Sequence, residues 1–173
     1  MTTVIQGPRQ SAASRTFREQ GRRVAWILIL IVDAGLLVWG GMAALAPEHL
    51  LGPGATPILT AGYEGFTRGS WSDLAQASPQ TAGYITLLFR TYGAYNVAFA
   101  LAAIALTATA FRRGDALAWW TLLLGHTIAL GAAMTYDRIA RAVGPFELSE
   151  YLGLAMIYAA LAVTAPFAGG TKR

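Results

Sequence analysis

Four polar side chains occur within otherwise apolar stretches of the sequence: Asp33, Asn96, His126 and Tyr158. At about 1.5 Å of helix per residue, each lies within about 5 Å of the middle of its stretch. Polar groups are costly at that depth in a membrane, so we expect the four to form one hydrogen-bonded layer inside a helical bundle. In this layer we expect Asp33 to be either protonated or paired to His126. An Asp33–His126 pair could carry a proton, bind a ligand or act as an acid–base pair, or it could only fix the register of the helices.

A second group of polar residues lies closer to the outer ends of the expected helices. It comprises Arg90, Asp137, Glu147 and Glu150. We expect Arg90 to pair with one or two of these acids, because a charge at membrane depth needs a partner. The pattern predicts a pocket open to the outside, with Asp33 and His126 at its floor and the second group at its rim. A salt-bridged cap that holds no ligand is the alternative.

The common catalytic templates are missing from the sequence. It has no cysteine, which excludes disulfides, thiolate metal sites and iron–sulfur clusters. It also has no phosphate-binding loop, no Gly-x-Ser-x-Gly elbow and no His-Glu-x-x-His zinc helix. Its two histidines, His49 and His126, fall at different expected depths, which argues against a haem held between them. We therefore predict no metal site, and the sequence indicates no particular cofactor.

The composition is that of a single membrane domain. Of the 173 residues, 55% are hydrophobic and only 13% are charged, against about 25% charged residues in an average soluble domain. Four apolar stretches are long enough to cross a bilayer: residues 24–46, 84–111, 116–136 and 146–167. The predicted fold is all-α, an integral membrane antiparallel four-helix bundle that occupies residues 24–168.

The connection between the first two expected spans, residues 47–83, is long. Structureless loops of more than about 15 residues are uncommon, so we expect this outer loop to be partly ordered, with a short helix over residues 72–77. Pro47 is expected to end the first span, because proline cannot continue a helix. Pro145 fits the first turn of the fourth span, where its missing N–H has no cost.

Basic residues predict the orientation of the chain. The segment 1–23 holds five arginines, and the segment 169–173 ends in Lys172 and Arg173. With both termini in the cytoplasm, nine basic residues lie inside and three lie outside. This bias predicts a multi-pass protein of the cell membrane with a cytoplasmic tail at each end. Because arginines before a first span are expected on these grounds, no nucleic-acid partner is needed to explain them.

One stretch resembles a known family. The run Leu88-Phe89-Arg90-Thr91-Tyr92-Gly93-Ala94-Tyr95-Asn96-Val97-Ala98-Phe99-Ala100 resembles the arginine–glycine helix start of DoxX-like bacterial four-helix membrane proteins. The length, the four expected spans and the basic inner loop agree with that group. The resemblance implies a small bacterial inner-membrane protein, such as an accessory subunit in quinone-linked electron transfer, and it supplies no catalytic residues.

Three functions remain open. The first is a non-enzymatic accessory subunit or interaction protein with a membrane-protein partner, favoured by the absence of catalytic motifs and by small residues at four-residue spacing, such as Ala98 and Ala102. The second is a binder or carrier of a small lipophilic ligand, a quinone or a lipid. The third is an intramembrane enzyme that uses an Asp/His pair. The candidate ligand-binding residues are Asp33, Arg90, Asn96, His126, Asp137, Glu147, Glu150 and Tyr158.

Overall fold

A computed structural model describes residues 12–52, 55–141 and 145–165 of the chain. The side chains of residues 12–19 and 145–147 lie outside this description. Within the described residues the secondary structure is helical throughout, and the only pairing of extended backbone is an isolated bridge between Leu51 and Pro57. The predicted all-α class is therefore confirmed.

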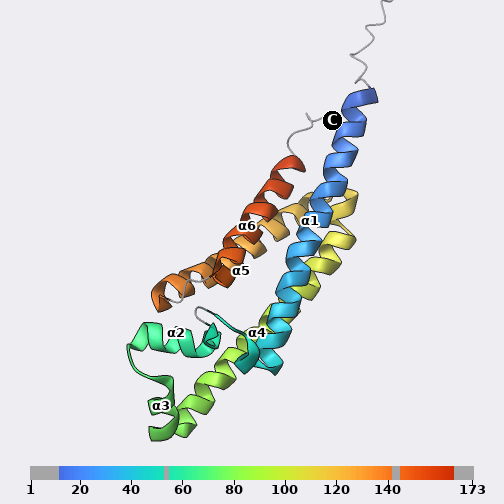
Figure 1. Cartoon of the computed structure of the whole chain (residues 1–173). Coiled ribbons are helices and arrows are strands. Elements are labelled where there is room, and N and C mark those ends of the chain that lie inside the picture. The colour runs from blue at the N-terminus through green and yellow to red at the C-terminus, as the bar shows by residue number, and fades with distance from the viewer. Residues whose placement is uncertain (1–11, 53–54, 142–144, 166–173) are drawn as a thin grey trace, which may run out of the picture.

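Long helices dominate the chain (Figure 1). They are α1 (Ala12–Leu45), α4 (Pro79–Ala108), α5 (Ala116–Ala140) and α6 (Pro145–Val163). Among the described residues, three segments are long and apolar enough to cross a membrane: Gln20–Leu45, Pro79–Arg113 and Ala116–Ala140. The apolar part of α6, Leu148–Val163, is shorter. The fourth span therefore stays a prediction.

The first helix extends further towards the N-terminus than expected. It begins at Ala12, inside the segment 1–23 that we expected to be a tail, and so the helix continues beyond its apolar part. Residues 1–11 and the expected tail 169–173 lie outside the described residues. At the other end the helix stops at Leu45, and Pro47 opens the short 3-10 helix η1 (Pro47–His49), as the proline predicts.

The long connection after α1 is ordered, as expected, and holds more structure than expected. It contains α2 (Ile58–Thr67) and α3 (Trp71–Ala77). The short helix predicted over residues 72–77 corresponds to α3, whose first turn is capped by the Ser70 side chain accepting from the Asp73 N–H at 3.3 Å. The sequence prediction missed α2 entirely and placed the start of the next helix, α4, five residues too late.

Two residues determine the turn between α4 and α5, one through its backbone conformation and one through a helix cap. The 3-10 helix η3 (Phe111–Arg113) ends at Gly114, whose φ of +83° is a conformation that glycine adopts without a steric penalty. Asp115 then caps α5, because its carboxylate accepts a hydrogen bond from the Ala118 N–H at 2.9 Å. These residues form the turn that brings the two helices side by side at this end.

The closest helix contact joins α1 to α4. A Cβ added to Gly93 would lie 2.5 Å from the Ala44 nitrogen, and one added to Gly40 would lie 2.9 Å from the Gly93 oxygen. Only glycine permits backbones to approach so closely, which is the usual role of small residues between membrane helices. In Figure 1, α1 and α4 lie along each other, whereas α5 and α6 form a second pair.

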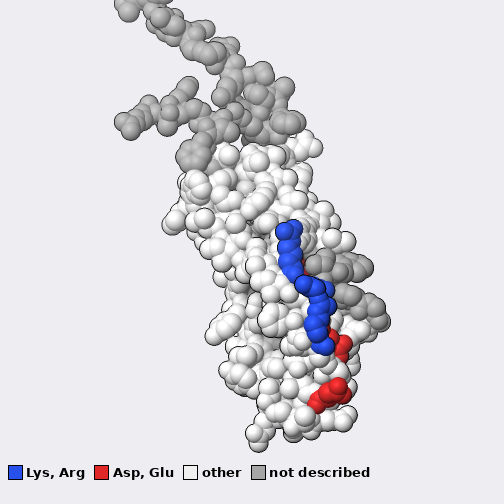
Figure 2. Space-filling model, turned by 90° about the vertical axis from the view of Figure 1, so that its left-hand side faces the viewer, with Lys and Arg blue, Asp and Glu red and all other residues white. Residues whose placement is uncertain are grey.

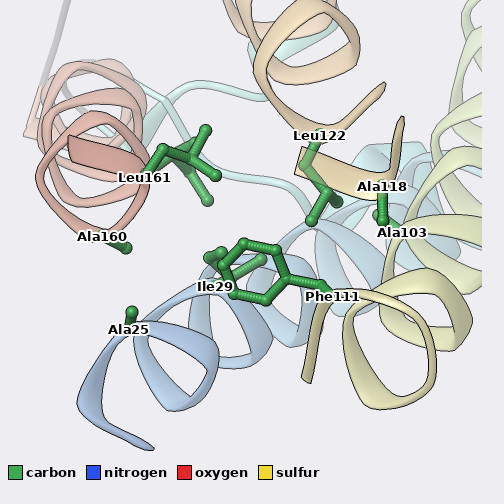
Figure 3. Close-up of a cluster of buried hydrophobic side chains, with 9 residues drawn as sticks. Ala25, Ile29, Ala103, Phe111, Ala118, Leu122, Ala160 and Leu161 are labelled. Atoms are coloured by element: carbon green, nitrogen blue, oxygen red, sulfur yellow. The ribbon is translucent and has the colours of Figure 1, made fainter. Parts of the chain in front are cut away.

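The apolar core lies at the end of the molecule that holds η3. Its largest cluster joins all four long helices through buried side chains that include Ile29, Phe111, Leu122 and Leu161 (Figure 3). A smaller cluster, formed around Ala43, Leu50 and Ile58, lies at the opposite end, beneath α2. The two pairs of long helices are therefore joined by the larger core at one end. At the other end α2 joins them, because it contributes Ile58 to the smaller cluster and also contacts α5.

The outer surface of the long helices is apolar. Exposed large hydrophobic side chains occur on each of them, for example Val38, Leu101, Ile128 and Leu152, each more than half exposed. On the face that Figure 2 shows, charged side chains are confined to a narrow strip, and the rest of the described part of that face is uncharged. Such a surface suits hydrocarbon better than water.

Candidate functional site

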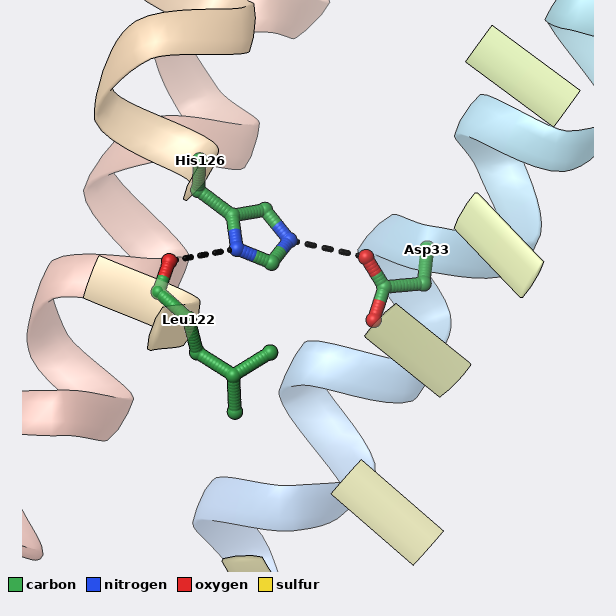
Figure 4. A network of polar contacts seen from close by, with 3 residues as sticks. All are labelled: Asp33, Leu122 and His126. Carbon is green, nitrogen blue, oxygen red and sulfur yellow. Dashed lines mark hydrogen bonds and ion pairs between the residues drawn. The ribbon is translucent and has the colours of Figure 1, made fainter. Parts of the chain in front are cut away.

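The sequence prediction of an Asp33–His126 pair is confirmed. Asp33 lies on α1 and His126 on α5, and both side chains are fully buried, with 0% exposure. The His126 Nε2 atom lies 2.8 Å from the Asp33 Oδ1 atom (Figure 4). This bond joins the two helix pairs across the interior of the molecule.

The second ring nitrogen of His126 also has a hydrogen-bond partner. Nδ1 lies 2.8 Å from the backbone oxygen of Leu122, and because a carbonyl can only accept, Nδ1 must carry a hydrogen. One further proton must then lie between Nε2 and Oδ1. The pair is either an imidazolium beside a carboxylate or a neutral imidazole beside a carboxylic acid, and its net charge is zero in both forms.

The surroundings of this pair are apolar. The Phe99 ring meets the imidazole edge to face, with the ring centroids 5.2 Å apart. The second carboxyl oxygen of Asp33, Oδ2, is buried and makes no hydrogen bond to any of the described residues. The pair therefore lies in packed interior and not at the floor of an open pocket, which corrects that part of the sequence prediction.

Asn96 and Tyr158 do not join the pair in one layer. The Asn96 side chain donates to the Tyr92 backbone oxygen, one turn back along α4, at 3.1 Å. The Tyr158 hydroxyl lies 3.0 Å from the Thr127 hydroxyl, and the tyrosine is 40% exposed. The expected layer of four residues is therefore wrong for two of them, because each finds a nearer partner on its own or a neighbouring helix.

Arg90 also has a different partner from the one expected. Its guanidinium lies 3.9 Å from the carboxylate of Glu48, and both side chains are about half exposed. Glu48 belongs to η1, directly after α1, and the sequence prediction had not considered it for this pair. The side chain of Glu147, another expected partner, lies outside the described part of the structure.

A cavity of about 310 Å³ lies beneath α2, where the helix pairs diverge. Its lining comes from α1, α2, α4, α5 and α6. The wall carries the side chains of two acids and two tyrosines, Asp137, Glu150, Tyr92 and Tyr136, together with the indole of Trp39, and the other lining residues are aliphatic or aromatic. The sequence prediction named both acids but missed the tyrosines as lining residues.

A second, larger cavity of about 620 Å³ adjoins the first. The two share Trp39, Tyr92, Ala133 and Glu150 on their walls, and the second also reaches Asn96. Trp39 is a residue from which the sequence could have indicated this cavity. An indole in the body of an expected span, away from both membrane interfaces, needs a partner inside the protein.

Comparisons of the chain with protein-family models, with curated proteins and with solved structures found no match. Within the described ranges, no group of three His, Cys, Asp or Glu side chains is arranged to hold a metal ion. The functional argument therefore depends on the buried pair, the two cavities and the membrane-like surface.

Proposed function

We propose that this chain is a multi-pass membrane protein that binds a small lipophilic molecule in the cavity beneath α2. The observation that carries the proposal is the cavity itself, which has an apolar wall with a few polar groups that come together from different helices. Its volume of about 310 Å³, enlarged by the adjoining space, falls in the range of small-molecule sites, about 300–1,000 Å³. A molecule that reaches the site from the bilayer would be lipophilic.

The proposal includes the full predicted topology, an antiparallel four-helix bundle with both termini in the cytoplasm. With 19 residues, α6 is about 28 Å long, which is close to the thickness of the hydrocarbon core. The Arg22 side chain donates to the Arg112 backbone oxygen, so two of the basic segments counted as internal lie at the same end of the molecule. That clustering supports the orientation.

Labelling of single cysteines tests the orientation, since the natural chain has none. In intact cells, a membrane-impermeant maleimide should label Gln76→Cys in the exposed part of α3 and should not label Arg113→Cys. The opposite pattern would place the cavity on the cytoplasmic side.

The other two functions have less support. The exposed apolar side chains suit lipid as well as a membrane-protein partner, so the accessory-subunit function remains a prediction. An acid–base enzyme would need Asp33 and His126 at a substrate, whereas both are buried away from the cavity walls. That position favours a structural role for the pair. A quinone and a lipid are both small lipophilic molecules, so either fits this proposal.

A variant that fills the cavity tests the proposal. Ala133, on the wall shared by the two cavities, is replaced by tryptophan, and the matched control is Ala102→Trp at an exposed position of α4 outside the lining. The probe is the neutral fluorophore 1-N-phenylnaphthylamine, titrated into nanodiscs with and without protein. We expect saturable binding by the natural chain and the control, and its loss in Ala133→Trp.

Equal binding by all three proteins, or no binding above that of empty nanodiscs, would contradict the proposal. Circular dichroism and gel filtration establish that the variants fold. If Ala133→Trp does not fold, Ala133→Leu replaces it, because the smaller side chain still occupies part of the space.

A further inference from the structure

We infer that the ligand is a lipid whose hydrocarbon chain lies crosswise between the two helix pairs and enters from the side, out of the bilayer. This inference rests on the proposed function and names the class of ligand and its route. It is carried by three observations on the described residues: a row of adjoining cavities, exposed apolar side chains at both sides of this row, and close packing towards both ends of the molecule.

Three cavities adjoin one another between the helix pairs. Besides the cavities of about 310 Å³ and about 620 Å³, a third of about 340 Å³ lies between α2, α4 and α5. The third cavity shares Leu59, Ile85 and Tyr136 with the one of about 310 Å³. That cavity shares Tyr92 and Ala133, among others, with the largest one. The cavity beneath α2 is therefore the middle member of a continuous row.

One side of the row opens between α1 and α6. The largest cavity is lined there by Ile31, Val38 and Leu152, each more than half exposed. Gly35, on the same wall, is exposed, and a Cβ added to it would meet nothing within 4 Å. In the proposed topology these residues face hydrocarbon, so the opening connects the cavity to the bilayer.

The other side of the row opens between α4 and α5. The middle cavity is lined there by Leu88 and Tyr136, each about half exposed, and by the exposed Ala132. The third cavity continues this opening beneath α2, where Phe66 and Ile139 are more than half exposed. The row thus runs from one apolar side of the molecule to the other.

The row is closed towards both ends of the molecule. At the end that holds α2, a Cβ added to Gly65 would overlap the Ala140 backbone oxygen, and one added to Gly62 would lie 2.7 Å from the Tyr136 hydroxyl. This close contact of α2 with α5 leaves little room for a ligand to pass. At the opposite end the larger apolar core fills the space between the helices. The openings between the helix pairs are therefore the direct route to the middle cavity.

The wall determines what can fill the row. Most residues that line the largest cavity are aliphatic, whereas a water molecule needs about two to four polar partners. An empty apolar cavity loses the dispersion contacts of the atoms that line it. A hydrocarbon chain restores these contacts and stays in apolar surroundings as it moves in from the bilayer. Because a chain is long and narrow, it suits a row of cavities with an opening at each side.

The test measures displacement of 1-N-phenylnaphthylamine from the full-length chain in nanodiscs. The compact fluorophore reports on the middle cavity, and 1-hexadecanol, added as a known mole fraction of the lipid, supplies the chain. The shorter alcohol 1-octanol is the control for chain length. We expect 1-hexadecanol to displace the fluorophore at a mole fraction at least about tenfold lower than 1-octanol does.

Two variants each obstruct one opening. Gly35→Trp places a large side chain between α1 and α6, and Ala132→Trp places one between α4 and α5. The matched control is Ala102→Trp, at an exposed position outside the lining. Leucine replaces tryptophan at either opening if the variant does not fold.

Both opening variants should bind the fluorophore within about threefold of the natural chain, because one opening stays free in each. Both should need at least about tenfold more 1-hexadecanol for displacement, because the chain can no longer pass through the row. This result, with the control Ala102→Trp unchanged, supports the inference.

The contrary outcomes separate this inference from the proposed function. If Ala133→Trp abolishes fluorophore binding but the two alcohols displace it equally well, the cavity is a ligand site that holds no crosswise chain, and the inference fails alone. It also fails alone if 1-hexadecanol displaces the fluorophore from either opening variant as readily as from Ala102→Trp. If fluorophore binding does not depend on Ala133, both fail.

Discussion

Replacing His126 by leucine should destabilise the protein strongly, because it leaves the Asp33 carboxyl buried without its partner. Both side chains are 0% exposed, and the bond between them is 2.8 Å long. Removing one member of a buried ion pair costs about 3–5 kcal/mol, and leaving a neutral polar group unpaired costs about 1–3 kcal/mol. The expected loss in the free energy of unfolding is therefore about 1–5 kcal/mol. A loss in the upper part of this range indicates an imidazolium beside a carboxylate, and a loss in the lower part indicates a neutral imidazole beside a carboxylic acid.

Two matched variants separate this cost from a loss of packing. In Asp33→Asn, the amide N–H can donate to the His126 Nε2 atom, since the Leu122 carbonyl already holds the hydrogen on Nδ1. This variant should lose less than about 1 kcal/mol. Replacing both residues by leucine removes the buried polar groups together and should restore much of the stability lost by His126→Leu.

The assay is reversible unfolding in mixed micelles, followed by circular dichroism, with the single and double variants in one thermodynamic cycle. A coupling energy between the two sites above about 1 kcal/mol is expected. The reasoning would be refuted if His126→Leu were no less stable than Asp33→Asn, or if the double variant were no more stable than the worse single variant.

Three further predictions concern the helix contacts and caps. Gly93→Ala should lower the unfolding free energy by about 1–3 kcal/mol, because the added Cβ would meet the α1 backbone. The matched control is Gly83→Ala, which has open space around it and should be neutral or stabilise by up to about 1 kcal/mol. Arg90→Ala should change the unfolding free energy by less than about 1 kcal/mol, since its pair with Glu48 is half exposed; a larger loss would mean that Arg90 has a buried partner. Asp115→Ala should cost about 1 kcal/mol through the lost cap of α5, and an unchanged midpoint in a thermal melt would contradict this.

Some of the fold could be predicted from single residues with strict physical roles. Pro47 and Pro145 mark a helix end and a helix start, as expected from a residue that lacks an N–H. Asp33 and His126 could be paired because each is polar at the middle of an apolar stretch, where a group must find a partner inside the protein. Depth along a helix follows directly from the sequence.

Rotation about the helix axis does not follow from depth, and this explains the errors in the predicted site. Tyr158 lies at the predicted depth but faces the outside of α6, where Thr127 is its partner. Asn96 satisfies its amide on its own helix. The hydrophobic pattern of α4 and α6 is nearly uniform around the helix axis, so it does not indicate which side faces the interior.

The cavity and the ion pair of Arg90 could not be predicted from the sequence, because both depend on contacts between segments that are far apart in the chain. Glu48 reaches Arg90 because η1 turns back towards α4 after α1 ends. The cavity exists because α2 spans the space between diverging helices, and α2 itself was missed because the glycines and prolines around it indicate a loop. Two acids of the cavity wall were predicted as site residues from their charge and their position at the outer ends of the helices, while the aromatic wall was not predicted.

Native mass spectrometry of the full chain, released from its own membrane in native lipid, tests the central claim most directly. The account predicts a defined small-molecule adduct on the natural chain and on Ala102→Trp, and its absence from folded Ala133→Trp. An adduct on all three proteins, or none on the natural chain, would contradict the claim that the cavity beneath α2 is a ligand site.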